Sequence, residues 1–208
     1  DLLIDNNSSI NTDIMNFLSI DCSTDLGSLF VKVKNKTFSK ILQSDKSNND
    51  LLMKQILDFF EENNLKLPDI QSVIAGLSPL PGAKEFLDGL RARTQVLILS
   101  DTFLQFANPL MRQLDWPTLF CNHLEMEGDR VANYHLRQPD QKRQSVLALK
   151  SLNYTVISAG DSYNDTSMLA EAHHGILFRA PENVREEFSQ FPAVDEYSEL
   201  LGQIEAHL

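Results

Sequence analysis

The densest group of side chains that could do chemistry lies at Ala159–Asp165, with the sequence AGDSYND. It directly follows an apolar segment, 155–159, that we expect to form a strand. A carboxylate at the end of a strand, beside the start of a helix, suits Mg²⁺, which takes a few hard oxygen ligands and keeps several waters. Gly160 lets the backbone come close, and Asn164 and Asp165 are residue types that cap helices. A capped turn without a metal explains the same spacing, so the pattern alone leaves both interpretations open.

Two further candidate groups lie upstream. Ser100-Asp101-Thr102 follows the apolar run Val96–Leu99, and we expect a strand there and then an amphipathic helix. A serine at that junction is most simply an N-cap, but the unpaired N–H groups of a first helical turn also form a seat for an anion. Lys142, in the segment QKRQ, is the third candidate, because an ammonium offsets negative charge that accumulates during phosphoryl transfer. A solvated helix lysine is the ordinary alternative.

The elements that must position these residues alternate along the second half of the chain. We expect helices at 83–93, 103–114, 141–150 and 163–171, and strands at 96–99, 118–121, 155–159 and 175–178. The segments 123–126 and 130–135 are expected to pair as a hairpin. Apolar strands separated by helices predict a parallel sheet covered on both faces. Ligands bind such sheets where the carboxyl ends of the strands open into loops, which is where Ser100 and Asp161 fall.

The first half of the chain has a different composition. No arginine precedes Arg91 and no alanine precedes Ala75, although eight arginines and twelve alanines occur from those positions on. Lysine and arginine have nearly equal helix propensity, so secondary structure does not explain the shift. It favours two stretches of different origin that meet between about residues 50 and 75. In this half we expect a strand at 16–20, a hairpin of 28–33 with 37–42, and a helix at 51–63.

Charge and composition limit the partners. The chain of 208 residues has 29 acidic and 18 basic side chains, and the resulting formal charge of −11 disfavours nucleic acids and anionic membranes. A hydrophobic fraction of 42% is typical of a globular protein. No apolar run reaches the ~18 residues that span a bilayer, and the first residues lack the pattern of a secretory signal. Cys22 and Cys121 have no metal-binding spacing, so we expect a cytoplasmic protein.

The three candidate groups together resemble motifs two, three and four of the haloacid dehalogenase (HAD) superfamily. Longer segments resemble the bacterial phosphoserine phosphatases that also act as homoserine phosphotransferases. They are LSPLPGAKEF, VLILSDTF, PLMRQL, KRQSV, AGDSYNDT and GILFRAPENV, beginning at residues 77, 96, 109, 142, 159 and 175. With 52–75 the resemblance covers about residues 51–208. It implies an α/β fold: a Rossmannoid three-layer core with a parallel sheet at 76–208, a remnant helical cap at 51–75, and an atypical N-terminal strand and hairpin at 1–50.

The resemblance also implies roles for individual residues. The ligands of Mg²⁺ would be Asp161 and Asp165. The groups that bind the substrate and its phosphate would be Ser100, Asp101, Lys142 and Asn164. The superfamily's reaction passes through an aspartyl-phosphate, in which a carboxylate attacks phosphorus, a second acid two residues later protonates the leaving oxygen, and water then releases phosphate. The chain would thus be a phosphoserine phosphatase of serine and threonine metabolism, and a homodimer.

The nucleophile motif departs from this pattern. The superfamily has Asp-x-Asp or Asp-x-Glu after its first strand, whereas here Asp21-Cys22-Ser23 follows the strand expected at 16–20. Asp21 takes the place of the nucleophile, and Ser23 stands where the acid should be. Serine is a far weaker acid, and loss of a positioned general acid costs ~10²–10⁴ in rate. A catalytically silent domain that binds phosphate or Mg²⁺ without turnover is therefore the alternative.

Residues 15–50 carry a second resemblance. The segment NFLSIDCSTDLGSLFVKVKNKTF, at 16–38, resembles the opening strand and hairpin of the actin-like ATPase class, and most of all the subunit with that fold in tRNA threonylcarbamoyladenosine biosynthesis. With the shift in composition this favours a chimeric chain, and it adds a weaker alternative, a partner protein in tRNA modification. A divergent phosphatase whose N-terminus has drifted is the simpler explanation.

Overall fold

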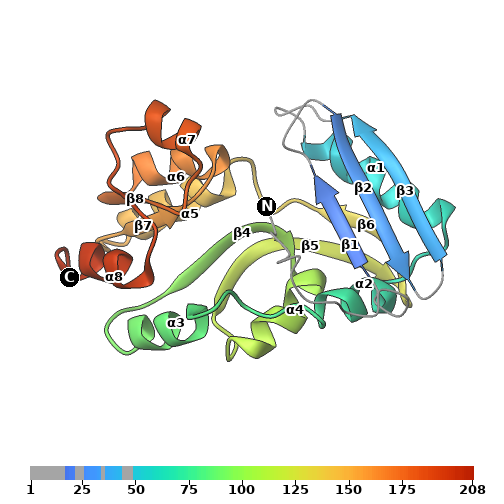
Figure 1. The fold of residues 1–208 in the computed structure, drawn as a ribbon, viewed down its shortest axis with the longest axis horizontal. Coiled ribbons are helices and arrows are strands. Elements are labelled where there is room, and N and C mark those ends of the chain that lie inside the picture. The colour runs from blue at the N-terminus through green and yellow to red at the C-terminus, as the bar shows by residue number, and fades with distance from the viewer. Residues whose placement is uncertain (1–16, 22–25, 34–35, 44–48) are drawn as a thin grey trace. The chain divides into compact units, whose positions relative to one another are not determined.

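The computed structural model describes residues 17–21, 26–33, 36–43 and 49–208, which form two compact units (Figure 1). Unit 1 holds the chain up to Ser78 together with Phe103–Leu110 and His123–His135. Unit 2 holds Pro79–Thr102, Met111–Asn122 and Leu136–Leu208. The sequence analysis placed Phe103–Leu110 and His123–His135 in the core at 76–208, but both segments cluster with the N-terminal part of the chain. Within the described ranges, no helix has the length and apolar character needed to cross a bilayer.

Unit 1 contains an antiparallel sheet. Its strands, in the order β1-β2-β3, are β1 (Phe17–Asp21), β2 (Leu26–Val33) and β3 (Lys36–Gln43). Val33 pairs with Lys36 at the end of the β2–β3 ladder, which confirms the predicted hairpin. The strand expected at 16–20 is β1, and it pairs with β2 from Phe17 opposite Lys32 to Asp21 opposite Ser28.

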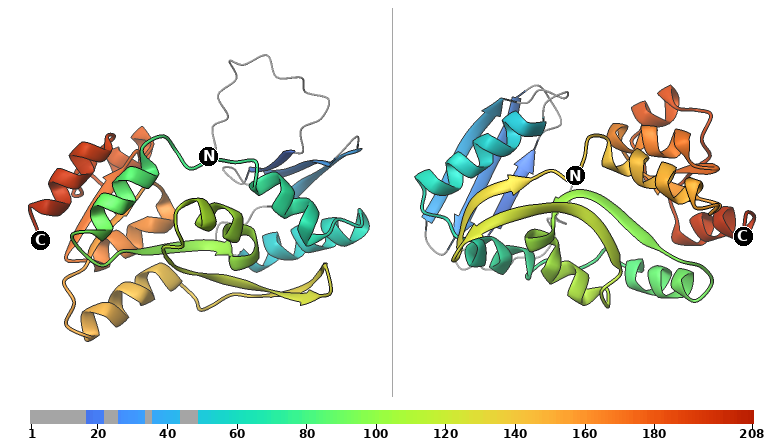
Figure 2. Two further views of the ribbon diagram at one scale, coloured as in Figure 1. Left: turned by 90° about the horizontal axis from the view of Figure 1, so that it is seen from below. Right: turned by 180° about the vertical axis from the view of Figure 1, so that it is seen from behind.

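The inner face of this sheet is covered by a helix. Leu29 and Val31 are buried while Phe30 between them is exposed, as the two-residue repeat of a strand requires. Two helices follow, α1 (Asn49–Glu62) and α2 (Leu67–Ile74). The ribbon of α1 lies across one face of the sheet in both views of Figure 2, and its Phe59 packs into the same core as Leu29 and Val31. Burying each such side chain contributes about 1.5–3 kcal/mol.

Unit 2 contains a parallel sheet of three strands. Their order is β7-β8-β9, and they span Ile157–Gly160, His174–Phe178 and Ala193–Val194. The helices of this unit are α3 (Ala83–Arg91), α5 (Gln141–Ser151), α6 (Thr166–Glu171), α7 (Glu182–Glu187) and α8 (Tyr197–Glu205). Together these elements give the α/β architecture that the sequence predicts.

The two faces of this parallel sheet pack against different helices. Ile176 and Leu177 are neighbours on β8, so their side chains point to opposite faces. Leu177 packs with residues of α5, α6 and α7, whereas Ile176 packs with residues of α3 and α8. The sheet is therefore the middle of three layers, as predicted.

A third sheet has the order β4-β5-β6, with strands at Leu97–Phe103, Thr118–Glu127 and Arg130–His135. The last two pair antiparallel, and Glu127 lies opposite Arg130, which confirms the predicted hairpin. The next helix, α4, spans Leu104–Gln113. The helix expected at 103–114 is α4, but the sequence analysis ended the preceding strand at Leu99, and this was wrong. The strand continues through Phe103.

Candidate functional site

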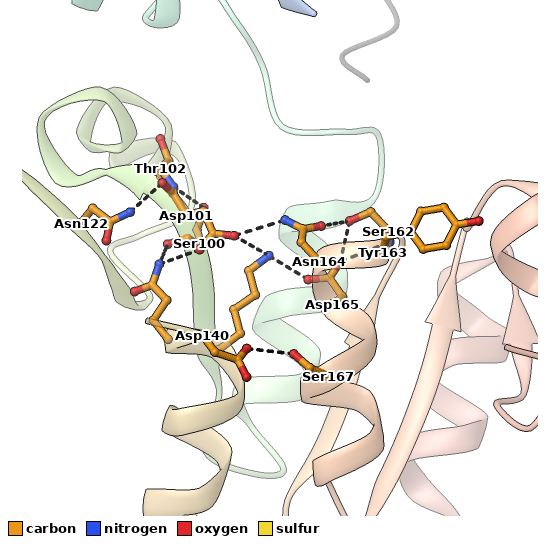
Figure 3. A network of polar contacts seen from close by, with 12 residues as sticks. Ser100, Asp101, Thr102, Asn122, Asp140, Ser162, Tyr163, Asn164, Asp165 and Ser167 are labelled. Atoms are coloured by element: carbon orange, nitrogen blue, oxygen red, sulfur yellow. Dashed lines mark hydrogen bonds and ion pairs between the residues drawn. The ribbon is translucent and has the colours of Figure 1, made fainter. Parts of the chain in front are cut away.

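A buried lysine lies at the centre of the polar cluster in unit 2. Lys142, in the first turn of α5, is 9% exposed. Its ammonium lies 2.8 Å from Asp165 Oδ1 and 3.3 Å from Asp101 Oδ2. Figure 3 shows these two carboxylates facing each other from separate segments. Lys142 therefore joins the end of β4 to the residues that follow β7.

Burial and charge act in opposite directions on this ion pair. Burial alone would lower the pKa of Lys142, but the carboxylates of Asp165 and Asp101 outweigh it and raise that pKa. Burial alone would likewise raise the pKa of Asp165, and the charge and hydrogen bond of Lys142 outweigh it and lower that pKa. Both groups are therefore charged at neutral pH.

The loop after β7 is organised by the carboxylate of Asp165. Its Oδ2 accepts hydrogen bonds from the backbone N–H groups of Asp161 and Ser162 at 3.1 and 3.3 Å, and from the Ser162 hydroxyl at 3.0 Å. Gly160 is required here, because a Cβ at this position would lie 2.5 Å from the Asp165 Cβ. The sequence interpretation of Gly160 as a site of close approach is confirmed.

Asn164 ties the same loop to β4. Its amide Nδ2 donates to Asp101 Oδ2 at 3.2 Å, and its Oδ1 accepts a hydrogen bond from the Ser162 hydroxyl (Figure 3). Asp161, by contrast, is exposed and makes no side-chain hydrogen bond or ion pair with the part of the chain that the structure describes. The loop therefore holds two acids in different states, with Asp165 fully engaged and Asp161 available.

Ser100 lies within β4 and not at the start of a helix. Its Oγ accepts the Thr102 N–H at 3.3 Å, so the expected anion seat of a first helical turn is not formed at this residue. The Ser100 hydroxyl proton is still free to be donated to a phosphoryl oxygen. Ser100, Lys142 and the loop at Asp161 thus belong to one network.

Two buried amides in this network were missed by the sequence analysis. The Nε2 of Gln141 donates to Ser100 O and to Asp101 Oδ1, both at 2.8 Å, and the Nδ2 of Asn122 donates to Asp101 O at 2.8 Å. Gln141 and Asn122 are 6% and 5% exposed. The place of Gln141 immediately before Lys142 was the one available signal, and nothing in the sequence marks Asn122.

The fit of this site to a divalent cation can be judged from its donors. Among the residues that the structure describes, no three His, Cys, Asp or Glu side chains gather into a metal-binding group. Asp165 is occupied by Lys142 and by the loop, which leaves Asp161 as the available carboxylate. Three carboxylates (Asp101, Asp161 and Asp165) against the one ammonium of Lys142 give a formal charge of −2. Such a site fits Mg²⁺, which binds proteins through one or two carboxylates together with substrate phosphate.

The proposed nucleophile lies in the other unit. Asp21 is the last residue of β1, and its side chain lies outside the described part of the structure, as do Cys22 and Ser23. Its role stays a prediction from the sequence.

The fold and the site define a class of protein. The family model of haloacid dehalogenase-like hydrolases matches residues 17–173, and the chain belongs to that family. The match begins at β1, so it includes most of the segment that resembles the actin-like class. The interpretation of the chain as a chimera with a tRNA-modifying subunit finds no support.

Two curated relatives narrow the class. The phosphoserine phosphatase ThrH of Pseudomonas aeruginosa is 62% identical over 162 residues, which cover 77% of this chain and 79% of the relative. A phosphoserine phosphatase of Pseudomonas syringae pv. tomato is 63% identical over 152 residues, or 73% of this chain. The chain covers 64% of that second relative, just under two thirds. The chain is therefore a phosphoserine phosphatase-like HAD hydrolase by similarity.

Solved structures agree on the fold. A HAD family hydrolase of Salmonella enterica serovar Typhi has a TM-score of 0.62 at 23% identity, covering 77% of this chain and 58% of its own. A phospho-aspartyl intermediate analogue of a phosphoserine phosphatase has a TM-score of 0.57 at 20% identity, covering 67% and 70%. At these identities the likeness supports the architecture alone.

Proposed function

We propose that this chain is a Mg²⁺-dependent phosphomonoester hydrolase that acts on phosphoserine. The observation that carries the proposal is the buried ammonium of Lys142, held between the carboxylates of Asp101 and Asp165 in a network that Gln141 extends to Ser100. Hydroxyl and ammonium donors at the ends of strands in an α/β fold are suited to phosphoryl oxygens. The names of the two curated relatives supply the substrate.

The charge of the site supports a requirement for a divalent cation. A phosphate dianion would meet a formal charge of −2 from the three carboxylates and Lys142, and like charges repel strongly in a partly buried site. Asp161, whose carboxylate is exposed and available, would hold Mg²⁺. The ion would supply positive charge to the phosphoryl oxygens.

The protein residues have separate tasks in this proposal. The Ser100 hydroxyl donates to one phosphoryl oxygen, and Lys142 neutralises charge on another as it develops. Asp21 attacks phosphorus, so the bond to the serine oxygen breaks as an aspartyl-phosphate forms. The leaving oxygen takes up a proton from solvent, and water then cleaves the acyl phosphate, releasing inorganic phosphate and regenerating the carboxylate. Transfer of the same phosphoryl group to homoserine in place of water would be the phosphotransferase reaction.

A second function has its own support. Ser23 stands where the superfamily has its general acid, and its hydroxyl is a far weaker acid than a carboxyl group. This departure favours a domain that binds phosphate or Mg²⁺ without turnover.

Phosphate release from phosphoserine distinguishes the two functions. For the enzyme we expect release that EDTA abolishes and Mg²⁺ restores, and at least a 100-fold loss in Asp161→Asn and in Asp21→Asn. Glu186→Gln is the matched control, because it removes an exposed acid of α7 that has no hydrogen bond or ion pair with the described residues. Binding of Mg²⁺ or inorganic phosphate with no release from the unaltered chain would instead establish the silent domain.

A further inference from the structure

A tyrosine within the acidic loop has no part in the mechanism above. Tyr163 opens the short 3₁₀ helix η1 (Tyr163–Asp165). Figure 3 shows its ring extending away from Asp101 and Asp165, out of the polar cluster. The ring of Tyr163 therefore makes its contacts on the side of the loop that faces away from Asp101 and Asp165.

Among the described residues, the hydrogen-bonding and aromatic partners of the Tyr163 side chain belong to α7 and the residue after it. The phenolic hydroxyl donates to Glu187 Oε2 at 2.8 Å, and the amide of Asn183 donates to the phenolic oxygen at 3.4 Å. The ring also meets Phe188 edge to face, with centroids 5.9 Å apart at 73°. A hydrogen bond to a carboxylate is stronger than one between neutral groups, and the edge-to-face contact fixes the ring's direction.

Helix α7 is a firm support for these contacts. Val184 is 2% exposed and packs in the core between the sheet and α5 and α6. Arg185 donates to Ala180 O at 2.6 Å and forms an ion pair with Asp195. Core packing of Val184 and the two contacts of the Arg185 guanidinium both hold α7, so the helix moves little relative to the sheet.

We propose that Tyr163 is a positioning residue that, through Glu187, fixes the loop backbone that presents the carboxylate of Asp161. The loop has an inner anchor, the bond from the Asp161 N–H to Asp165 Oδ2 at 3.1 Å. The contact between Tyr163 and α7 is the outer anchor, two residues further along the chain. Asp161 lies beside both anchors, and its side chain makes no hydrogen bond or ion pair with the described residues, so the position of its backbone depends on these anchors. This inference rests on the proposed function, in which Asp161 holds Mg²⁺.

The test compares variants that remove the anchor with one that keeps it. Tyr163→Phe loses the hydroxyl and Glu187→Ala loses its acceptor, and for both we expect Mg²⁺ affinity, measured by calorimetry, to fall about tenfold. Backbone hydrogen exchange at Asp161 and Ser162 should quicken, with exchange in the core helices unchanged. Glu187→Gln keeps a carbonyl acceptor and should retain most of the affinity. The control is Tyr154→Phe, a tyrosine of similar exposure (46%) outside the loop.

The outcomes separate this inference from the proposed function. If Asp161→Asn abolishes Mg²⁺ binding while Tyr163→Phe and Glu187→Ala bind as tightly as the unaltered chain, Tyr163 does not position Asp161. If Asp161→Asn binds Mg²⁺ normally, the metal assignment fails. The hydrogen-exchange rates at Asp161 then decide whether Tyr163 anchors the loop. Unchanged exchange at Asp161 in Tyr163→Phe overturns the inference, whereas faster exchange upholds the anchor.

Discussion

At the scale of the residue, the site depends on one buried ion pair. Side-chain exposures of 11% for Lys142 and 9% for Asp165 mean that each charge is shielded from water and is stabilised in large part by the other. Removing one partner of such a pair leaves an uncompensated buried charge, which costs more than the pair itself contributes. The pair therefore maintains both the stability of unit 2 and the position of the ammonium.

Lys142→Met should be strongly destabilising and its effect should depend on pH. At pH 7 we expect a loss of about 3 kcal/mol in the free energy of unfolding, measured by urea denaturation, because Asp165 stays buried without its cation. Without Lys142 only the hydrogen bonds from Ser162 and from the Asp161 N–H still oppose the burial that raises the pKa of Asp165, so the carboxyl takes up a proton more readily as pH falls. The difference between variant and unaltered chain should therefore shrink between pH 7 and pH 5.

The unaltered chain should behave in the opposite sense in acid. Because the pKa of Asp165 is lowered in the folded state, its contribution to stability is present above its unfolded pKa of about 3.9 and is lost as pH falls through the folded value. Lys84→Met is the control, since Lys84 pairs with Asp88 and Asp115 on the surface and should matter little. A pH-independent loss in Lys142→Met would show that packing, and not charge, is what the lysine provides.

Part of this site could be predicted from single residues. Gly160, Asp161 and Lys142 were singled out by residue type and by their resemblance to the family's motifs, and the structure brings their segments together. The roles of the Gln141 and Asn122 amides could not be predicted, because an amide can donate or accept, and its partners are set only when the chain folds. Both meet Asp101 from elements distant in the chain.

At the scale of the element, the pattern of apolar residues predicted where helices and strands occur better than where they end. The strand at Leu97–Phe103 was cut short at Leu99 because Ser100-Asp101-Thr102 are polar. Polarity usually signals the end of a buried strand, but a strand that delivers functional groups continues in extended conformation while its side chains change type. The boundary is therefore misplaced at the functional residues themselves.

Two glycines offer a matched test of how tightly the elements pack. A Cβ at Gly175, on β8, would lie 2.5 Å from the backbone oxygen of Leu169, whereas one at Gly202, in α8, would meet nothing within 4 Å. Gly175→Ala should destabilise the chain by about 2 kcal/mol, because α6 must move off the sheet. Gly202→Ala should stabilise it by up to about 1 kcal/mol through helix propensity.

Thermal and urea unfolding of the two variants check this pair. If both substitutions changed the free energy of unfolding equally, α6 could move away from β8 without loss of stability. That result would contradict the close packing of this core.

At the scale of the whole molecule, the fold class could be predicted from the second half of the sequence, because alternating helices and apolar strands admit few architectures. The family was predicted from the resemblance of motifs in the same half. The origin of the first half could not be predicted. Its lack of alanine and arginine favoured a foreign segment, yet the family model matches from residue 17. Composition reports on substitution history as well as on fold, and a hairpin of short alternating strands carries little that is specific to one family.

The activity of the whole chain depends on whether its nucleophile motif works without a second acid. Asp21 and Ser23 have the spacing of the superfamily's nucleophile and general acid, with a hydroxyl in place of a carboxyl. If the missing acid limits turnover, Ser23→Asp should raise the rate of phosphate release from phosphoserine by ~10²–10⁴. Ser23→Asn is the control, since an amide has nearly the same shape and no acidic proton.

The gain must also vanish in the double variant Asp21→Asn with Ser23→Asp, because an acid without a nucleophile cannot form the aspartyl-phosphate. Initial rates with saturating Mg²⁺ measure all of these variants on one scale. An unaltered rate in Ser23→Asp would mean that another group already delivers the proton, or that the motif does not reach the phosphate at all. The Asp21→Asn variant separates these two cases, since only in the first does that substitution remove turnover.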